Sequence, residues 1–237
     1  MPQPPRKLPL RIGALALLAA AVVWAVLFGP RAATPSAVSE ARAADRAART
    51  GDLAQARASW QALWRERGQS PALAARLAWV SVQAGEIGPA AAWVLRGQLV
   101  EPRDRALRWV AERVREGGGL VGATPPRLPI TRLEWSVLAV LAGLAAGAAW
   151  PRRNASLVCA IVALIAGAVY PLQGLAARRS GAAVVVQSAR LEGSDLELQP
   201  GQVVTVIARG SARARVRAGR DDSGTVPASV VESVYGE

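Results

Sequence analysis

Three apolar stretches divide this chain of 237 residues, and they constrain its fold more than any other feature of the sequence. They cover residues 12–28, 133–150 and 155–177. At about 1.5 Å per residue, helices of this length approach the roughly 30 Å of hydrocarbon in a bilayer. We therefore expect a multi-domain membrane protein whose remaining residues form small domains between and after the apolar segments.

The first stretch follows a basic N-terminus and ends at Gly29-Pro30. Basic residues before an apolar run are typical of a signal sequence. Because the run is long and Pro35 disfavours cleavage, we interpret residues 1–30 as an uncleaved signal anchor, with a cleaved signal peptide as the alternative. Both interpretations predict that the following residues are exported.

The second and third stretches are separated only by a short turn that contains Arg152 and Arg153. Residues 133–177 are therefore predicted to form a transmembrane helical hairpin. Basic residues concentrate on the cytoplasmic side of membrane proteins, so this turn is expected in the cytoplasm. The resulting topology places the chain in the inner (cytoplasmic) membrane of a bacterium, with its other domains facing the periplasm.

The formal net charge of +12 raises the question of a nucleic-acid partner. About half of this surplus flanks the apolar stretches, where Lys and Arg orient membrane proteins. No run of like charge is interleaved with aromatic residues, so nucleic acid is not an expected partner. The chain also has no histidine and carries no motif for a nucleophile, a phosphate or a metal. We expect a non-enzymatic protein without a cofactor.

An internal repeat of 34 residues lies between the first two apolar stretches, where Gly51-Asp-Leu recurs as Gly85-Glu-Ile. Antiparallel helices approach closely only where side chains are small, and Ala78, Ala90 and Gly97 meet this need. Gly85 suits a turn that requires positive φ. This register resembles the tetratricopeptide family, and a generic pair of helical hairpins is the alternative.

The resemblance implies an α-solenoid domain over residues 37–116. Its parts are a repeat at 37–70, a second repeat at 71–104 and a capping helix at 105–116. Residues 117–130 are rich in glycine and proline and are predicted to be a linker.

Tetratricopeptide stacks bind protein segments on the face formed by the first helix of each repeat. The residues predicted on that face are Ala75, Trp79, Val82 and Trp109. Two tryptophans on one face could anchor a protein partner. The alternative is that they close the core of a short stack.

Residues 181–237 combine short β-branched runs with glycine-rich turns, which predicts a small all-β barrel. The stretches at 198–207 and 224–231 resemble those of bacterial SH3 domains. Thr225 stands where that family has Trp, so we transfer the fold and not its aromatic ligand groove. Arg213, Arg215 and Arg217 alternate along one strand and are a candidate contact for an anionic partner. A solvated strand face is the alternative.

The order of segments resembles the BatE proteins of the Bacteroides-aerotolerance (Bat) systems. This resemblance implies a membrane-anchored scaffold in envelope or oxidative-stress tolerance. Its implied partners are Bat proteins with von Willebrand factor A-type domains and, indirectly, a MoxR-type AAA+ ATPase. Two alternatives are a protein bound to cell-wall peptidoglycan and an assembly factor for a membrane complex.

Overall fold

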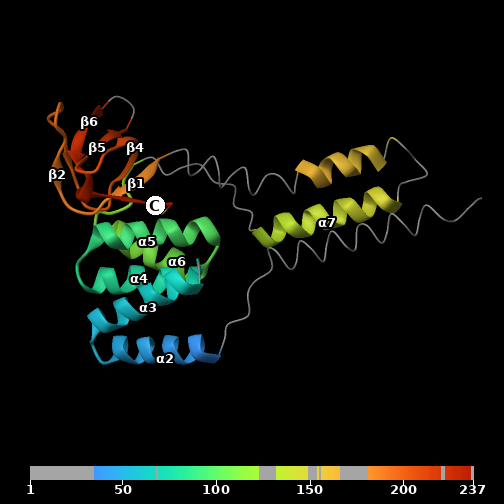
Figure 1. Cartoon of the computed structure of the whole chain (residues 1–237), viewed down its shortest axis with the longest axis horizontal. Coiled ribbons are helices and arrows are strands. Elements are labelled where there is room, and N and C mark those ends of the chain that lie inside the picture. Colours follow the sequence, from blue (N-terminus) through green and yellow to red (C-terminus); the bar gives the residue numbers. More distant parts are fainter. Residues whose placement is uncertain are drawn as a thin grey trace, which may run out of the picture. The chain divides into compact units, whose positions relative to one another are not determined.

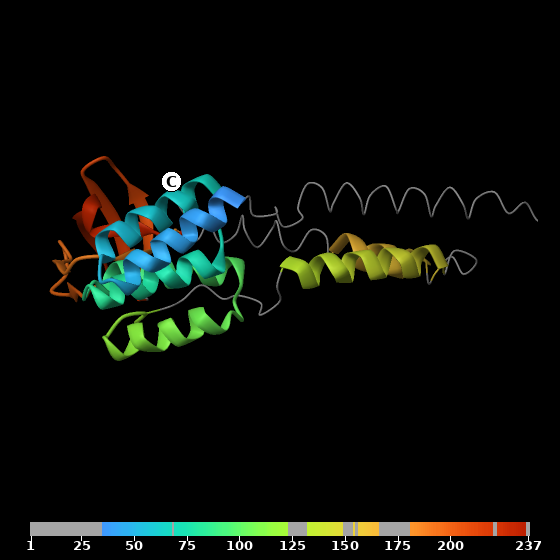
Figure 2. The same ribbon diagram turned by 90° about the horizontal axis from the view of Figure 1, so that it is seen from below.

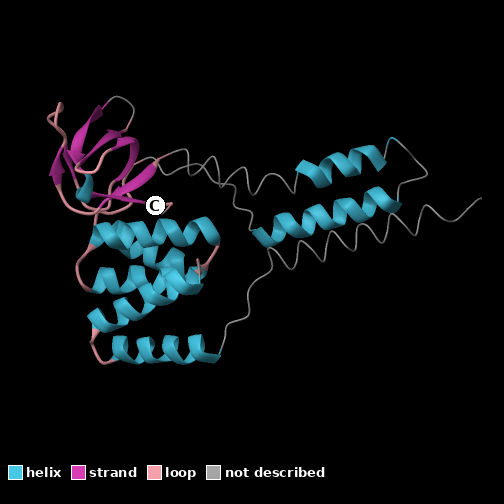
Figure 3. Cartoon of the chain, viewed as in Figure 1, coloured by secondary structure: helices cyan, strands magenta, loops and turns pink. Residues whose placement is uncertain are grey.

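The computed structural model describes residues 35–67, 69–122, 132–148, 154, 156–165, 181–219 and 222–235. The chain divides into two compact units. One comprises Met1–Ala33 with Arg132–Gln173, and the other comprises Thr34–Thr131 with Gly174–Glu237. Figure 3 shows that, within the second unit, the helices and the strands occupy separate parts.

The membrane-protein fold class predicted from the apolar stretches is wrong for the described residues. Within the described ranges, every helix falls short of the length or the apolar character needed to cross a membrane. Helix α7 (Arg132–Ala148) has 17 residues. A helix of that length extends about 26 Å, which is less than the roughly 30 Å of bilayer hydrocarbon. Residues 156–165 are also helical, while the first stretch and the segment 1–30 lie outside the described residues.

The predictions of membrane-spanning helices in the described part of 133–177 and of an inner-membrane location facing the periplasm are corrected together with that class. Residues 149–153, 155 and 166–177 of the predicted hairpin lie outside the described residues. Both predictions rested on the apolar composition of the stretches. Composition indicates that a segment is hydrophobic, but it does not determine how many residues join one continuous helix.

Five helices of the second unit form an antiparallel stack (Figure 1). Their bounds are α2 (Pro35–Arg49), α3 (Leu53–Arg67), α4 (Pro71–Gln83), α5 (Ile87–Val100) and α6 (Arg105–Glu116). Gly51, Gly85 and Gly118 follow α2, α4 and α6 with φ of 86°, 74° and 83°. Glycine adopts this left-handed conformation without the steric cost of a Cβ atom, so each of these helices ends at a glycine turn.

Local signals define where the later helices begin. Pro71 occupies the first turn of α4, where its missing N–H is not needed. The Asp104 carboxylate accepts a hydrogen bond of 2.8 Å from the backbone N–H of Leu107 and so caps α6. The buried residues of α6 follow helical spacing, at Leu107, Val110, Ala111 and Val114.

The remaining part of this unit is a small β-domain. Its strands are β1 (Ala182–Val185), β2 (Ala189–Arg190), β3 (Glu197–Leu198), β4 (Val203–Arg209), β5 (Arg213–Ala218), β6 (Asp222–Pro227) and β7 (Val231–Ser233). Five of them form an antiparallel sheet in the order β6-β5-β4-β1-β7, and β2 pairs with β3. A 3₁₀ turn, η1 (Ala228–Val230), precedes β7.

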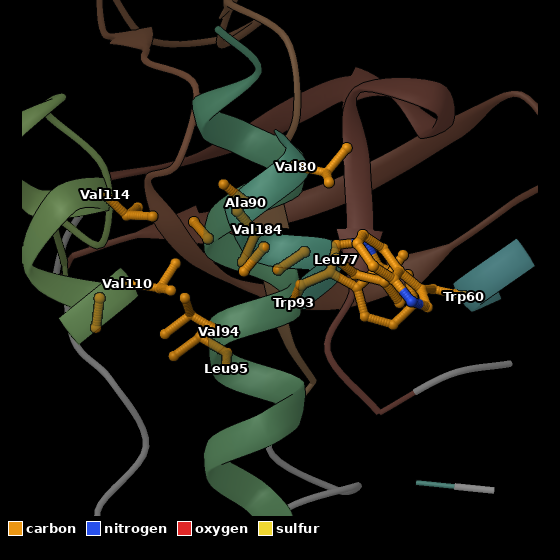
Figure 4. Close-up of a cluster of buried hydrophobic side chains, with 14 of the residues drawn as sticks. Trp60, Leu77, Val80, Ala90, Trp93, Val94, Leu95, Val110, Val114 and Val184 are labelled. Carbon is orange, nitrogen blue, oxygen red and sulfur yellow. The ribbon is translucent and has the colours of Figure 1, made fainter. Parts of the chain in front are cut away.

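Helix α5 packs directly on the β-domain, as the two orthogonal views agree (Figures 1 and 2). Val184, Val203 and Val234 from the β-domain belong to the same buried cluster as the helical core. Figure 4 draws Val184 among the buried side chains of this cluster, together with Ala90 of α5. A Cβ atom added at Gly88 of α5 would lie 2.6 Å from the backbone of the β-domain, so glycine permits this close approach.

The segment after α6 also joins the β-domain. Leu120 donates a backbone hydrogen bond of 2.8 Å to Gly201, and Val203 donates one of 2.7 Å to Val121. The start of the predicted 117–130 linker is therefore a series of turns that is hydrogen-bonded to the β-domain. Residues 123–130 lie outside the described residues.

Candidate protein-binding surface

Trp79 on α4 and Trp109 on α6 lie side by side, with ring centroids 4.9 Å apart and planes inclined by 47°. The guanidinium carbon of Arg113 lies 5.7 Å from the centroid of the Trp109 ring, within the range of a cation–π contact. We call these three residues the tryptophan surface. Arg113 was not singled out from the sequence, although it follows Trp109 by four residues and so lies on the same helix face.

The two tryptophans differ in their surroundings. Trp79 is half-buried and packs against the main hydrophobic core, whereas Trp109 is 50% exposed. The alternative prediction, that the two tryptophans close the core of the helical stack, therefore fits Trp79 better than Trp109. An indole that keeps half of its surface in water leaves apolar area available to a partner.

The other two residues predicted on the binding face, Val82 and Ala75, are less exposed to solvent than Trp109. Val82 is half-buried and packs against the same core as Trp79. Ala75 is buried in a small cluster with Ala74 and Leu107. Both support the helices behind the tryptophan surface, and Ala75 presents little area to a partner.

Cationic residues surround Trp109 on α6. Arg113 pairs with Glu116 at 2.8 Å, and Arg115 pairs with Glu112 at 2.7 Å. Arg105 and Arg108 are exposed and form no ion pair with the residues that the structure describes. These two arginines precede Trp109 by four residues and by one, so the N-terminal half of α6 carries the uncompensated positive charge.

The three arginines predicted as an anionic contact extend from the exposed face of β5, whose residues alternate between exposed and buried. Arg213 pairs with Glu192 at 2.7 Å. Arg215 and Arg217 are exposed and have no ion pair within the described part of the chain.

The junction between α5 and β7 contains a polar cluster that sequence reasoning missed. Arg96 pairs with Glu232 at 2.7 Å, donates to the carbonyl of Ser233 at 2.7 Å and lies 4.7 Å above the Trp93 ring. A shallow hollow of about 390 Å³ adjoins this cluster and is also lined by Arg209 and Ser229. No local pattern relates α5 to a strand more than a hundred residues later, so no sequence signal could have paired them.

The described residues hold no group of three or more His, Cys, Asp and Glu side chains placed to bind a metal. Among the described residues, the aromatic pair and the exposed guanidinium groups offer contacts for molecular recognition. The protein combines a helical stack with a small β-domain, and the tryptophan surface lies on the helical stack.

Comparisons of the chain with family models, with curated proteins and with solved structures give no match. The likenesses to tetratricopeptide, bacterial SH3 and BatE proteins thus stay predictions from the sequence.

Proposed function

We propose that this chain is a non-enzymatic adaptor that captures a segment of another protein on its tryptophan surface. The observation that supports this most strongly is the exposure of Trp109 beside Trp79, with Arg113 over its outer ring. Tryptophan and arginine are the residues most enriched among the energetic anchors of protein interfaces.

The packing behind the surface favours a binding role. Trp79 is held by the core, so the inner ring of the pair has a fixed position. A preorganised aromatic contact costs little conformational entropy when a partner binds. The partner would supply an apolar side chain that covers the exposed part of Trp109.

The charge around Trp109 also bears on the partner. Arg105 and Arg108 precede this ring on α6 and have no acidic partner among the described residues. A segment with a carboxylate close to its apolar anchor would be steered to this surface and oriented on it.

The β-domain would have a fixed orientation relative to this surface. Helix α5 packs in one buried cluster with Val184, Val203 and Val234 of the β-domain. The Arg96–Glu232 ion pair also joins α5 to β7 of that domain. The adaptor would therefore hold anything bound to its β-domain at a defined distance from the captured segment.

The resemblance to BatE proteins suggests which partners to test first. A Bat protein with a von Willebrand factor A-type domain would be the direct partner, and a MoxR-type ATPase would associate through it. The weakness of the SH3-like aromatic positions, with Thr225 in place of Trp, disfavours peptidoglycan as the main ligand.

The test compares Trp109→Ala with Trp64→Ala in the full chain. Trp64 contacts Trp93 edge to face at 5.2 Å inside the helical stack and lies outside the tryptophan surface. We expect Trp109→Ala to weaken binding of the purified partner domain about tenfold or more, as truncation of an anchor tryptophan typically does. Its thermal unfolding should change much less than that of Trp64→Ala.

Titration calorimetry measures the affinity, and circular dichroism verifies that each variant is folded. Equal binding by Trp109→Ala and the unmodified chain would exclude the tryptophan surface as the contact. A Trp109→Phe variant should recover part of the affinity, because it restores an aromatic ring.

A further inference from the structure

A second surface with exposed positive charge lies on the sheet of the β-domain, outside the tryptophan surface. The pairing register places Arg215 opposite Thr225 and Arg217 opposite Ser223 on β6. Thr205 of β4 is the neighbour of Arg217 on its other side. Because directly paired residues point to the same face of a sheet, these arginines and hydroxyl groups share one outward surface.

The spacing along β5 is regular. Residues two apart on a strand project from the same face at intervals of about 6.6 Å. Arg213, Arg215 and Arg217 therefore project from one face of β5 at regular intervals, and we call these three residues the arginine row. All three side chains are exposed, whereas the intervening Ala214 and Val216 are buried in the core of the β-domain.

Within the described part of the chain, one of the three arginines in this row forms an ion pair and the other two do not. Glu192, which forms a bridge with Thr225 at the outer edge of β6, reaches Arg213 at 2.7 Å. Arg215 and Arg217 have no acid in contact among the residues that the structure describes. The contact between Glu192 and Arg213 shows that a carboxylate beside β6 reaches this row.

An apolar side chain lies next to the row. Ile207 is the extra residue at the bulge in β4, between Val206 and Ala208, and it is 45% exposed. The residue that follows it, Ala208, pairs directly with Arg215. A partner could therefore combine an ionic contact with burial of Ile207.

We propose that the arginine row binds an extended acidic protein segment with carboxylates at alternate positions. An extended chain presents residues i and i+2 on one face at the same interval of about 6.6 Å, so two carboxylates would meet Arg215 and Arg217 in register. Each guanidinium can donate two parallel hydrogen bonds to a carboxylate. Ser223, Thr225 and Thr205 supply further donors beside them.

The experiment measures binding of labelled peptides to the full chain by fluorescence anisotropy. One peptide alternates glutamate and threonine, and a second has the same number of glutamates placed at every third position. In an extended chain the second arrangement puts successive carboxylates on opposite faces. We expect the alternating peptide to bind at least about fivefold tighter, because it alone engages both arginines at once.

The variants separate this surface from the rest of the chain. Arg215→Ala with Arg217→Ala should weaken binding of the alternating peptide about tenfold, and Arg213→Ala should weaken it less than about threefold. Trp109→Ala should leave it unchanged, so failure here is distinguishable from failure of the proposed function. A double Arg→Lys variant should bind with intermediate affinity, because lysine keeps the charge without the paired donors.

Three results would overturn the proposal. The first is equal affinity for the two peptides, which would mean that the row attracts acidic peptides whatever the spacing of their carboxylates. The second is no peptide binding, which would mean a solvated strand face. The third is tighter binding of a single-stranded oligothymidine than of the alternating peptide, dependent on the same two arginines, which would assign the row to a phosphate backbone.

Discussion

Arg96 and Glu232 are joined by an ion pair of 2.7 Å, although they lie 136 positions apart in the chain. Arg96 belongs to α5 and Glu232 to β7, so the contact crosses from the helical stack to the β-domain. The same guanidinium also donates to the carbonyl of Ser233 and covers the ring of Trp93. One side chain therefore connects a helix, a strand and an aromatic group of the core.

Replacing Arg96 by Ala should lower the free energy of unfolding by about 2–3 kcal/mol. The change removes a hydrogen bond to a backbone carbonyl, a half-buried ion pair and packing on Trp93. Chemical denaturation with urea measures the loss. The matched control is Arg190→Ala, which breaks the exposed pair with Asp195 and should cost less than about 1 kcal/mol. Equal losses in the two variants would contradict a special role for Arg96.

Replacing Gly88 by Ala should destabilise the contact between α5 and the β-domain by about 1–3 kcal/mol, the usual cost of overpacking. The new Cβ would lie 2.6 Å from the backbone of Val186, and a backbone cannot move aside as a flexible side chain can. Hydrogen exchange should show faster exchange of β1 amides. At Gly97 the same substitution meets the side chains of Leu107 and Ala74, so it should loosen α6 instead.

Replacing Gly85 by Ala should cost about 1–2 kcal/mol through backbone conformation alone. Its φ is 74° and no atom lies within 4 Å of the position of an added Cβ, so there is no steric clash with neighbours. Asn tolerates this conformation better than Ala, and Gly85→Asn should recover part of the loss. Thermal unfolding of the three chains measures the difference, and a clear gain of stability in Gly85→Ala would refute the explanation.

Replacing Trp79 by Ala should reduce the free energy of unfolding by about 2–4 kcal/mol, whereas Trp109→Ala should reduce it by less than about 1.5 kcal/mol. Trp79 packs against the core and Trp109 keeps 50% of its surface exposed. Urea denaturation of both variants tests the order. The reverse order would mean that Trp109 is the structural member of the pair.

Local structure was the part of this fold most accessible from the sequence. The glycines at 51 and 85 end helices with positive φ, and the alternation over residues 213–217 corresponds to the exposed and buried positions of β5. These features depend on residues close together in the chain, whose conformational preferences act before any distant contact forms. The second apolar stretch misled for a related reason, since its composition carried no information on the 17-residue length of α7.

Long-range arrangement was decided by the tertiary structure. The sequence placed Trp79 and Trp109 on one face, but the 4.9 Å approach of their rings depends on how α4 packs against α6. The junction of α5 with the β-domain had no sequence signal, because it requires Gly88, Arg96 and Val184 to meet elements far along the chain. Such contacts depend on shape and on burial of apolar area between whole elements, and no short sequence pattern encodes them.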